Sequence, residues 1–265
     1  MDNRPIGVFD SGMGGLTTVR RMHEIMPHEN IIYFGDTGRV PYGTRSPDAI
    51  LHYTRQDVAF LRSFDIKAIV VACNTVSAVA LETVASEIDV PMFGVVWPAC
   101  RKAAETTRTG RIGVIGTAAT VRSGVYERML QRARPELEIF TKACPLFVPL
   151  VENGRVQPGD IVIETVVAEY LEELKQKGID TLILGCTHYP LLHDVIAAYM
   201  GPEVRLIDSG AEVADFARRM LIPAEGQGKT RYFVSDDPEC FRSLAGLFLH
   251  GEIADEVGRV DIAQY

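Results

Sequence analysis

IKAIVVACNT at residues 66–75 and TLILGCTH at residues 181–188 decide the class of fold. Each stretch is a mostly apolar run that ends in a small residue, a cysteine and polar residues. Such runs are typical of strands buried on both faces, as in a parallel sheet that lies under helices. Each stretch therefore predicts an interior strand of an α/β protein, with its cysteine just beyond the end of the strand.

The rest of the chain alternates between short β-branched runs and segments with the period of a helix. We expect strands at 6–10, 30–34, 68–72, 92–95, 112–115, 138–141, 181–184, 204–207 and 231–234. We expect helices at 15–26, 46–64, 77–88, 121–132, 158–177, 190–200, 211–221 and 238–249. The helix at 46–64 has the clearest start, because Ser46 can cap it and Pro47 fits its first turn.

The pattern also repeats within the chain. IGVFD at 6–10 runs into Ser11-Gly12, and IGVI at 112–115 runs into Gly116-Thr117. Each of these starts is followed, later in its half of the chain, by one of the two cysteine-bearing strands. The simplest explanation is a pair of α/β lobes of like topology. The alternative is that any two strand–helix units look alike.

Composition excludes several classes of function. The chain has 265 residues, of which 47% are hydrophobic and 23% charged, and its net charge is −8. This acidic balance argues against nucleic acid or an anionic membrane surface as the main partner. No apolar run approaches the roughly 20 residues that span a bilayer, and the N-terminus lacks the apolar core of a signal peptide. Five cysteines without a CxxC pair indicate free thiols and a cytoplasmic protein.

Cys73 and Cys186 are the first candidates for chemistry. Ligands of open α/β sheets bind beyond the carboxyl ends of the strands, so two facing lobes would bring both thiols to one cleft. An ordinary thiol has a pKa of about 8.5, and a helix start lowers that pKa further. The alternative is a buried structural thiol, which we expect for the other cysteines, Cys100, Cys144 and Cys240.

Two further clusters flank the predicted strand ends. Asp10 and Ser11 precede the glycine-rich turn GMGG, which lacks the GxGxxG spacing of a dinucleotide site. His188 lies two residues beyond Cys186, where it could relay a proton. A Cys-x-His pair alone is weak evidence for zinc, so we expect no metal. The remaining histidines lie on predicted helices or at their edges and are expected at the surface.

Other polar residues follow the remaining strands. The second predicted strand is followed by Asp36 and the loop Pro41-Tyr42-Gly43. The sequence is compatible with a loop that contacts a ligand and with a plain turn. Thr117 and Thr120 flank a predicted helix start and could hold a carboxylate. Glu152 is acidic in the apolar setting VPLVENG, and its alternative is an exposed loop carboxylate.

Two similar bases that face each other across a ligand suit one kind of reaction. One base removes a proton from one face of a stereocentre and the other returns a proton to the opposite face, which inverts the centre. Donors must stabilise the charge that develops as the α-proton leaves; the candidates are Ser11, Asn74, Thr75, Thr117, Thr120 and Thr187. The sequence therefore predicts a racemase or epimerase of a small carboxylic acid, without choosing the acid.

Six segments, in order along residues 6 to about 192, carry a resemblance: IGVFDSGMGGLT, YFGDTGRVPYG, VVACNTVSA, IGTAAT, VPLVENG and LGCTHYPLL. Together they resemble the signatures of bacterial glutamate racemase. The resemblance implies cofactor-independent interconversion of L- and D-glutamate, supplying D-glutamate for peptidoglycan. It also implies a homodimer and a C-terminal segment that returns to complete the first lobe. The lobes are then 1–97 plus 208–265, and 98–207, with the active site between them.

The resemblance assigns roles to residues. It implies that Cys73 handles the proton of D-glutamate and Cys186 that of L-glutamate. It implies auxiliary polar groups near the thiols at Asp10, Asp36, Glu152 and His188. The substrate contacts that it implies are Asp10, Ser11, Pro41, Tyr42, Gly43, Asn74, Thr75, Thr117, Thr120, Thr187 and His188.

Three alternatives remain open from the sequence. A related racemase could act on aspartate or another small amino acid. A two-lobed amino-acid-binding protein would hold its ligand without exchanging the α-proton. A thiol nucleophile such as an amidase would use one cysteine and leave the second unexplained.

Overall fold

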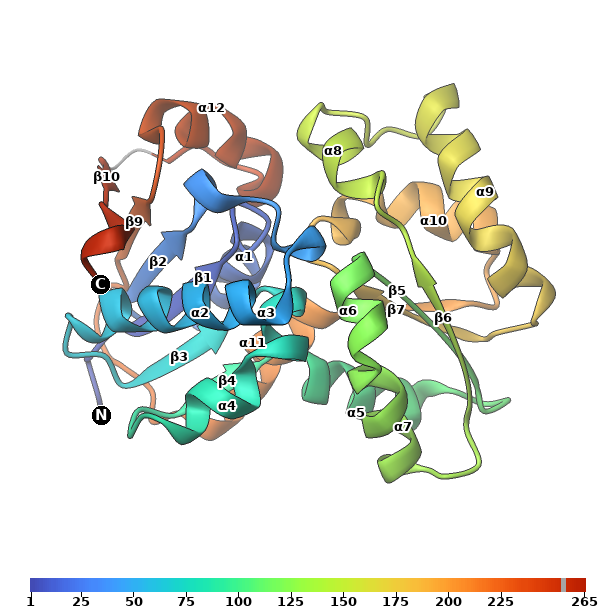
Figure 1. Ribbon diagram of the computed structural model, residues 1–265, viewed down its shortest axis with the longest axis horizontal. Helices are drawn as coiled ribbons and strands as arrows, with labels where there is room; N and C mark the ends of the chain where they lie inside the picture. The colour runs from blue at the N-terminus through green and yellow to red at the C-terminus, as the bar shows by residue number, and fades with distance from the viewer. Residues whose placement is uncertain (254–255) are drawn as a thin grey trace.

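The computed structural model describes residues 1–253 and 256–265, which form two lobes side by side (Figure 1). The first lobe is built on a six-stranded sheet of order β10-β9-β2-β1-β3-β4, and the second on a four-stranded sheet of order β6-β5-β7-β8. Every pair of neighbouring strands is parallel. The fold class predicted from the sequence, two α/β lobes with parallel sheets, is confirmed.

The strands have these bounds: β1 Ile6–Asp10, β2 Ile31–Gly35, β3 Ala68–Val71, β4 Met92–Gly94, β5 Arg111–Gly116, β6 Glu138–Ala143, β7 Thr181–Gly185, β8 Arg205–Asp208, β9 Thr230–Val234 and β10 Val257–Arg259. The α-helices are α1 Leu16–Ile25, α2 Pro47–Arg62, α3 Asn74–Val79, α4 Leu81–Ser86, α5 Val96–Thr106, α6 Ala118–Ser123, α7 Val125–Ala133, α8 Phe147–Glu152, α9 Ile161–Gln176, α10 His193–Met200, α11 Ser209–Met220 and α12 Pro238–Leu249. Short 3-10 helices are η1 Thr37–Arg39, η2 Tyr42–Thr44, η3 Tyr189–Leu192 and η4 Ile262–Gln264.

The two sheets share one strand order. β2-β1-β3-β4 in the first lobe corresponds to β6-β5-β7-β8 in the second. β3 and β7, which precede the two cysteines, therefore occupy equivalent places beside the central strands β1 and β5. The chain then returns through α11, and β9 and β10 extend the first sheet beyond β2. Lobe boundaries at 97/98 and 207/208 stay a prediction, and β8 itself runs to Asp208.

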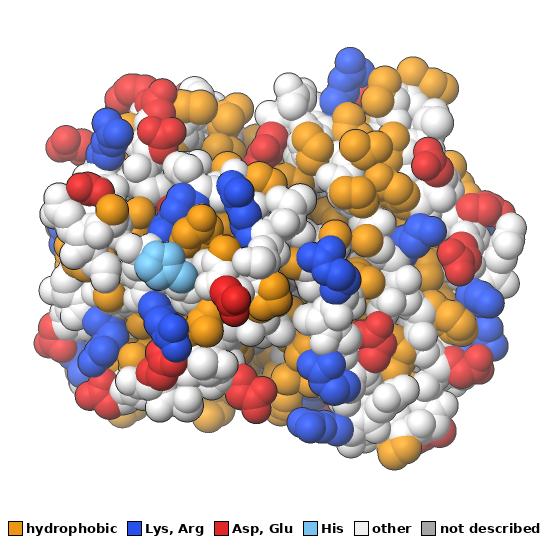
Figure 2. Space-filling view, in the orientation of Figure 1, with side chains coloured by type: hydrophobic (Ala, Val, Ile, Leu, Met, Phe, Trp, Pro, Cys, Tyr) orange, Lys and Arg blue, Asp and Glu red, His pale blue; other side chains and the backbone are white. Residues whose placement is uncertain are grey.

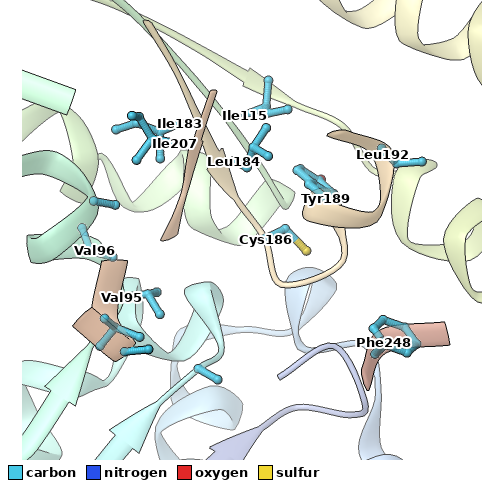
Figure 3. Packing of buried hydrophobic residues seen from close by; sticks show 14 of the residues in the cluster. Val95, Val96, Ile115, Ile183, Leu184, Cys186, Tyr189, Leu192, Ile207 and Phe248 are labelled. Carbon is cyan, nitrogen blue, oxygen red and sulfur yellow. The ribbon is translucent and has the colours of Figure 1, made fainter. Parts of the chain in front are cut away.

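Buried side chains hold the lobes together. Along β1, Ile6 and Val8 join one apolar cluster, whereas Phe9 joins a second cluster on the α2 side of the sheet, because successive strand residues point to opposite faces. The first cluster is continuous between the lobes. It includes both Val95 and Val96, at the start of α5, and Leu184 of β7 (Figure 3).

The elements that the sequence failed to predict have local causes. α5 and α8 contain Pro98 and Pro149, which argue against a helix when the chain is read alone. Both prolines lie in the first turn, where no backbone N–H is needed for an intrahelical bond. The helix expected at 121–132 is interrupted at Gly124, whose φ of 63° suits glycine. β10 was missed because it has only three residues.

The surface mixes charges of both signs on the face shown in Figure 2, and hydrophobic side chains gather over α8. Among the exposed large hydrophobic residues are Leu146, just before α8, and Ile161 at the start of α9. Within the described ranges 1–253 and 256–265, none of the helices is long and apolar enough to cross a bilayer.

Candidate active site

A cavity of about 320 Å³ lies where strand ends of the two sheets meet. Its wall includes residues of both lobes, from the loops after β1, β2 and β3 and from those after β5, β6 and β7. Most of the site residues predicted from the sequence line it: Ser11, Pro41, Tyr42, Gly43, Cys73, Asn74, Thr75, Thr117, Glu152, Cys186, Thr187 and His188.

The two thiols reach this cavity from equivalent strands. Cys73 follows β3 and is the N-cap of α3, and its Sγ donates to the Ser11 hydroxyl at 3.6 Å. Cys186 follows β7, but here a turn and η3 intervene before α10 begins. The exposed fractions are only 4% for Cys73 and 6% for Cys186. Both sulfurs are therefore available to a bound molecule and largely hidden from bulk water.

Burial controls the protonation of both thiols. Burial and, after it, the negative charge of Asp10 raise the pKa of Cys73 to about 12. The Val76 N–H at the start of α3 and the Ser11 hydroxyl lower that pKa, but by less than burial raises it. Burial also raises the pKa of Cys186. The start of α3 lowers the pKa of Cys73 as expected, but burial outweighs this effect, and the raised pKa values favour the neutral form of both thiols at pH 7.

His188 and Glu152 form a polar pair on the Cys186 side. His188 Nε2 lies 3.0 Å from Glu152 Oε1, and its Nδ1 lies 3.4 Å from the Thr187 hydroxyl. The Phe248 ring of α12 meets the imidazole edge-on at a centroid distance of 5.4 Å. Glu152 ends α8 and is half-buried, so it is more than an exposed loop carboxylate. The pair can carry a proton near Cys186.

Asp10 lies behind the cavity wall at the end of β1. Its side chain is completely buried, and its Oδ2 accepts the Gly12 N–H at 3.0 Å. Its Oδ1 has no hydrogen-bond partner among the described residues. Burial raises the pKa of this carboxyl, while the nearby His188 lowers it. Asp10 raises the pKa of both thiols through its charge, so it acts electrostatically on both sides of the site.

Asp36 also lies behind the wall. The Tyr42 hydroxyl and the Arg39 guanidinium donate to its Oδ2, and the Ser235 hydroxyl donates to its Oδ1 at 2.7 Å. Arg39 also pairs with the buried Asp57 at 2.9 Å. Among the described residues Asp36 therefore reaches the cavity only through Tyr42, and this network anchors the loop that carries Tyr42.

Three threonine hydroxyls connect the lobes at the cavity. The Thr75 hydroxyl lies 3.0 Å from that of Thr117 and 3.4 Å from that of Thr120, and the latter two lie 3.0 Å apart. Thr120 stands behind the other two and is absent from the cavity wall as described. This cluster brings residues 42 to 45 positions apart in the sequence together.

Two glycines allow the lobes to approach closely. A Cβ on Gly14 would lie 2.2 Å from Thr187 Oγ1 and 2.6 Å from His188 Nδ1, both in the second lobe. A Cβ on Gly43 would lie 2.7 Å from Thr117 Cβ. The glycine-rich turn after β1 is therefore a contact surface for the GCTH segment.

Sequence reasoning missed part of the cavity wall. The missed lining residues are Gly12, Val40, Thr44, Ala118, Cys144, Pro145, Val148, Pro149 and Tyr189. Several come from the VPLVENG region, where the helix α8 was not expected. Cys100 and Cys144 are buried as predicted, although Cys144 also lines the cavity. The expectation for Cys240 is wrong, because this thiol is exposed on α12 and has no core to fill there.

No group of three or more histidine, cysteine or acidic side chains able to hold a metal ion exists within the described residues. The five histidines expected at the surface, at positions 23, 28, 52, 193 and 250, are exposed. The polar groups of the cavity are therefore hydroxyl, amide, thiol, imidazole and carboxyl groups.

A parallel two-lobed fold with one thiol from each lobe in a shared cavity defines a class of enzymes that invert stereocentres. The family model for Asp/Glu/hydantoin racemases matches residues 6–217. The chain belongs to this family.

Comparison with individual proteins shows which members of the family the chain resembles. The chain is 47% identical over 258 residues to the glutamate racemase of Geobacter metallireducens, covering 95% of each chain. It is 50% identical over 212 residues to that of Streptococcus gordonii, covering 80% of this chain and 79% of the relative. The structure resembles glutamate racemase from Francisella tularensis in complex with D-glutamate, with a TM-score of 0.92, 37% identity and complete coverage of both chains.

Proposed function

We propose that this chain is a glutamate racemase that interconverts L- and D-glutamate with two thiol bases, Cys73 and Cys186. One observation carries the proposal: equivalent strands of two like sheets deliver one buried cysteine each to the same cavity. The names of its relatives support glutamate as the substrate, and the Francisella tularensis protein binds D-glutamate.

The reaction needs one thiolate and one thiol at a time. With D-glutamate bound, the Cys73 thiolate takes the α-proton, and the electron pair of the broken C–H bond moves into the α-carboxylate. The Cys186 thiol then gives its proton to the opposite face of the carbon and becomes the thiolate. The product is L-glutamate, and the reverse reaction exchanges the two roles.

Substrate binding creates the first thiolate in this proposal, because burial favours the neutral form of both thiols. The substrate's α-ammonium brings a positive charge beside the sulfurs, and an opposite charge nearby lowers a thiol's pKa. Asp10 and the His188–Glu152 pair are the groups to receive or return the protons, with His188 serving Cys186. Donors along the wall, among them Ser11 and Asn74, hold the carboxylates while charge develops.

The wider role belongs to the same proposal. A glutamate racemase supplies D-glutamate for peptidoglycan and thus supports the cell wall and cell shape. We propose that it acts in the cytoplasm as a homodimer and without an added cofactor. Size-exclusion chromatography with light scattering measures the number of chains in the assembly directly, and a monomeric mass would contradict the homodimer.

A stereochemical experiment in heavy water tests the proposed reaction. The chain is incubated with one enantiomer of glutamate and no added cofactor, and both pools are separated on a chiral column. Early product should carry deuterium at the α-carbon while the remaining substrate does not, because separate thiols take and give the proton. Equal early labelling of both pools would indicate a single base, and binding without exchange would indicate a binding protein.

A parallel assay tests the choice of acid. We expect a kcat/KM for glutamate well above that for aspartate, because the relatives that cover nearly the whole chain are named for glutamate. Faster turnover of aspartate would contradict the proposal and favour the alternative racemase.

A further inference from the structure

The Asn74 side chain has two ends in unlike surroundings. Asn74 begins α3, lines the cavity and is 2% exposed. Its Oδ1 accepts a hydrogen bond from the Tyr126 hydroxyl at 2.6 Å. Its Nδ2 is buried and has no hydrogen-bond partner among the described residues. A buried amide nitrogen without a protein partner is costly unless a ligand or an ordered water supplies the acceptor.

The side chain that meets Oδ1 comes from the other lobe. Tyr126 belongs to α7 and is 2% exposed, so its hydroxyl hydrogen needs an acceptor inside the protein. Ser209, at the start of α11, places its Oγ 3.2 Å from the same oxygen and 2.9 Å from the Leu184 carbonyl. A serine hydroxyl has one hydrogen, and the carbonyl is nearer, so Tyr126 is the principal donor to Oδ1.

This arrangement determines which way the amide faces. An asparagine amide has an accepting end and a donating end of nearly the same shape, and only its hydrogen bonds distinguish them. A hydroxyl donor on one side favours the oxygen there. The NH₂ group is then left on the side without a protein partner.

We propose that Tyr126 is a positioning residue, which orients the Asn74 amide so that its NH₂ group donates to a carboxylate of the bound amino acid. The inference rests on the proposed function, because it needs an anionic substrate in the cavity. Without the Tyr126 hydroxyl the amide can rotate by half a turn, and its oxygen then opposes the carboxylate. Tyr126 and Asn74 lie 52 residues apart in sequence, so only the assembled fold creates this contact.

A double-mutant cycle tests the coupling. Tyr126→Phe removes only the hydroxyl, and we expect KM for both enantiomers to rise about five- to tenfold while kcat changes less, the size of one hydrogen bond. In the Asn74→Ala background the same change should alter KM by less than about twofold, because the amide that it orients is gone. Tyr199→Phe is the matched control and should leave KM unchanged, because this partly buried tyrosine of α10 lies outside the cavity wall and its hydroxyl donates to Glu172.

A second variant keeps the test independent of how well Tyr126→Phe folds. Asn74→Asp keeps an oxygen for the Tyr126 hydroxyl but replaces the NH₂ group by a second oxygen. We expect it to raise KM more than Asn74→Ala does, since it opposes the substrate carboxylate. A KM for Asn74→Asp near that of the unaltered chain would overturn the inference, as would a full effect of Tyr126→Phe in the Asn74→Ala background.

The possible outcomes distinguish failure of the positioning role of Tyr126 from failure of the proposed function. If the unaltered chain racemises glutamate but the effects of Tyr126→Phe and Asn74→Ala on KM are additive, only the positioning role is overturned. An unaltered chain that leaves both enantiomers unchanged overturns the proposed function and, with it, this inference. A lower melting temperature of Tyr126→Phe with unchanged KM would indicate a structural role only and would also overturn the inference.

Discussion

The two halves of the cavity have the same scaffold but different surroundings. Cys73 and Cys186 both follow the strand beside the central strand of a parallel sheet. Cys73 is the N-cap residue of α3 and donates to Ser11, whereas Cys186 stands before a turn that carries His188, which contacts Glu152 of α8. The repeated topology places two sulfurs at one site, and the loops give each sulfur different neighbours. The two proton transfers should therefore respond differently to substitution.

Removal of either sulfur should have the largest effect. Cys73→Ala and Cys186→Ala should each lower racemisation by at least about a thousandfold in both directions, because proton transfer by a positioned group contributes up to about 10⁴-fold. Chiral chromatography measures the rate, and circular dichroism checks the fold. Cys240→Ala is the control, since this exposed thiol lies on α12 away from the cavity wall. Full activity in either cavity variant would refute the two-base assignment.

The alkylation rate of Cys73 can be compared between the folded cavity and the unfolded chain. At pH 8, Cys73 with a pKa of about 12 has roughly a thousandfold less thiolate than an ordinary thiol of pKa about 8.5. Iodoacetamide should therefore modify Cys73 about a thousandfold more slowly in the folded than in the urea-unfolded chain. The folded rate should rise about tenfold per pH unit from 7 to 10, because the thiolate reacts. Mass spectrometry of peptides follows each cysteine, and a plateau below pH 9 would contradict the raised pKa.

Gly14→Ala changes the first lobe but should displace residues of the second lobe at the cavity. The added Cβ would lie 2.2 Å from Thr187 Oγ1, so the turn after β1 or the GCTH segment must move. A displacement of about 1 Å can cost about a hundredfold in rate, and we expect kcat to fall by that order. Gly251→Ala is the matched control, because a Cβ there meets nothing within 4 Å. Normal activity of Gly14→Ala would show that this close approach is not needed.

His188→Asn tests whether the two proton transfers depend on different side chains. If His188 serves Cys186 alone, turnover of L-glutamate should fall about tenfold more than turnover of D-glutamate, measured as initial kcat in each direction. Glu152→Gln should produce a smaller effect of the same sign, since it acts through the 3.0 Å contact with His188. An equal fall in both directions would mean that His188 serves both thiols, as its influence on the pKa of Asp10 allows.

The sequence was most informative where a motif and a strand coincide. The two cysteine-bearing runs became β3 and β7 nearly as predicted, since burial on both faces leaves an unbroken apolar signal. α5 and α8 were not predicted, because the effect of a proline depends on whether it falls in the first turn. With α8 missing, the wall formed by Pro145, Val148 and Pro149 could not be anticipated.

The sequence by itself determined the α/β class, the family and the identity of most lining residues, because periodicity and motifs are local properties of the chain. Only the tertiary structure decided which polar groups face the cavity and which stand behind it, as Asp10, Asp36 and Thr120 do. It alone decided that burial outweighs a helix start at Cys73, and that Tyr126 meets Asn74. These properties depend on the exclusion of water and on contacts between distant segments, which exist only once the two lobes have packed together.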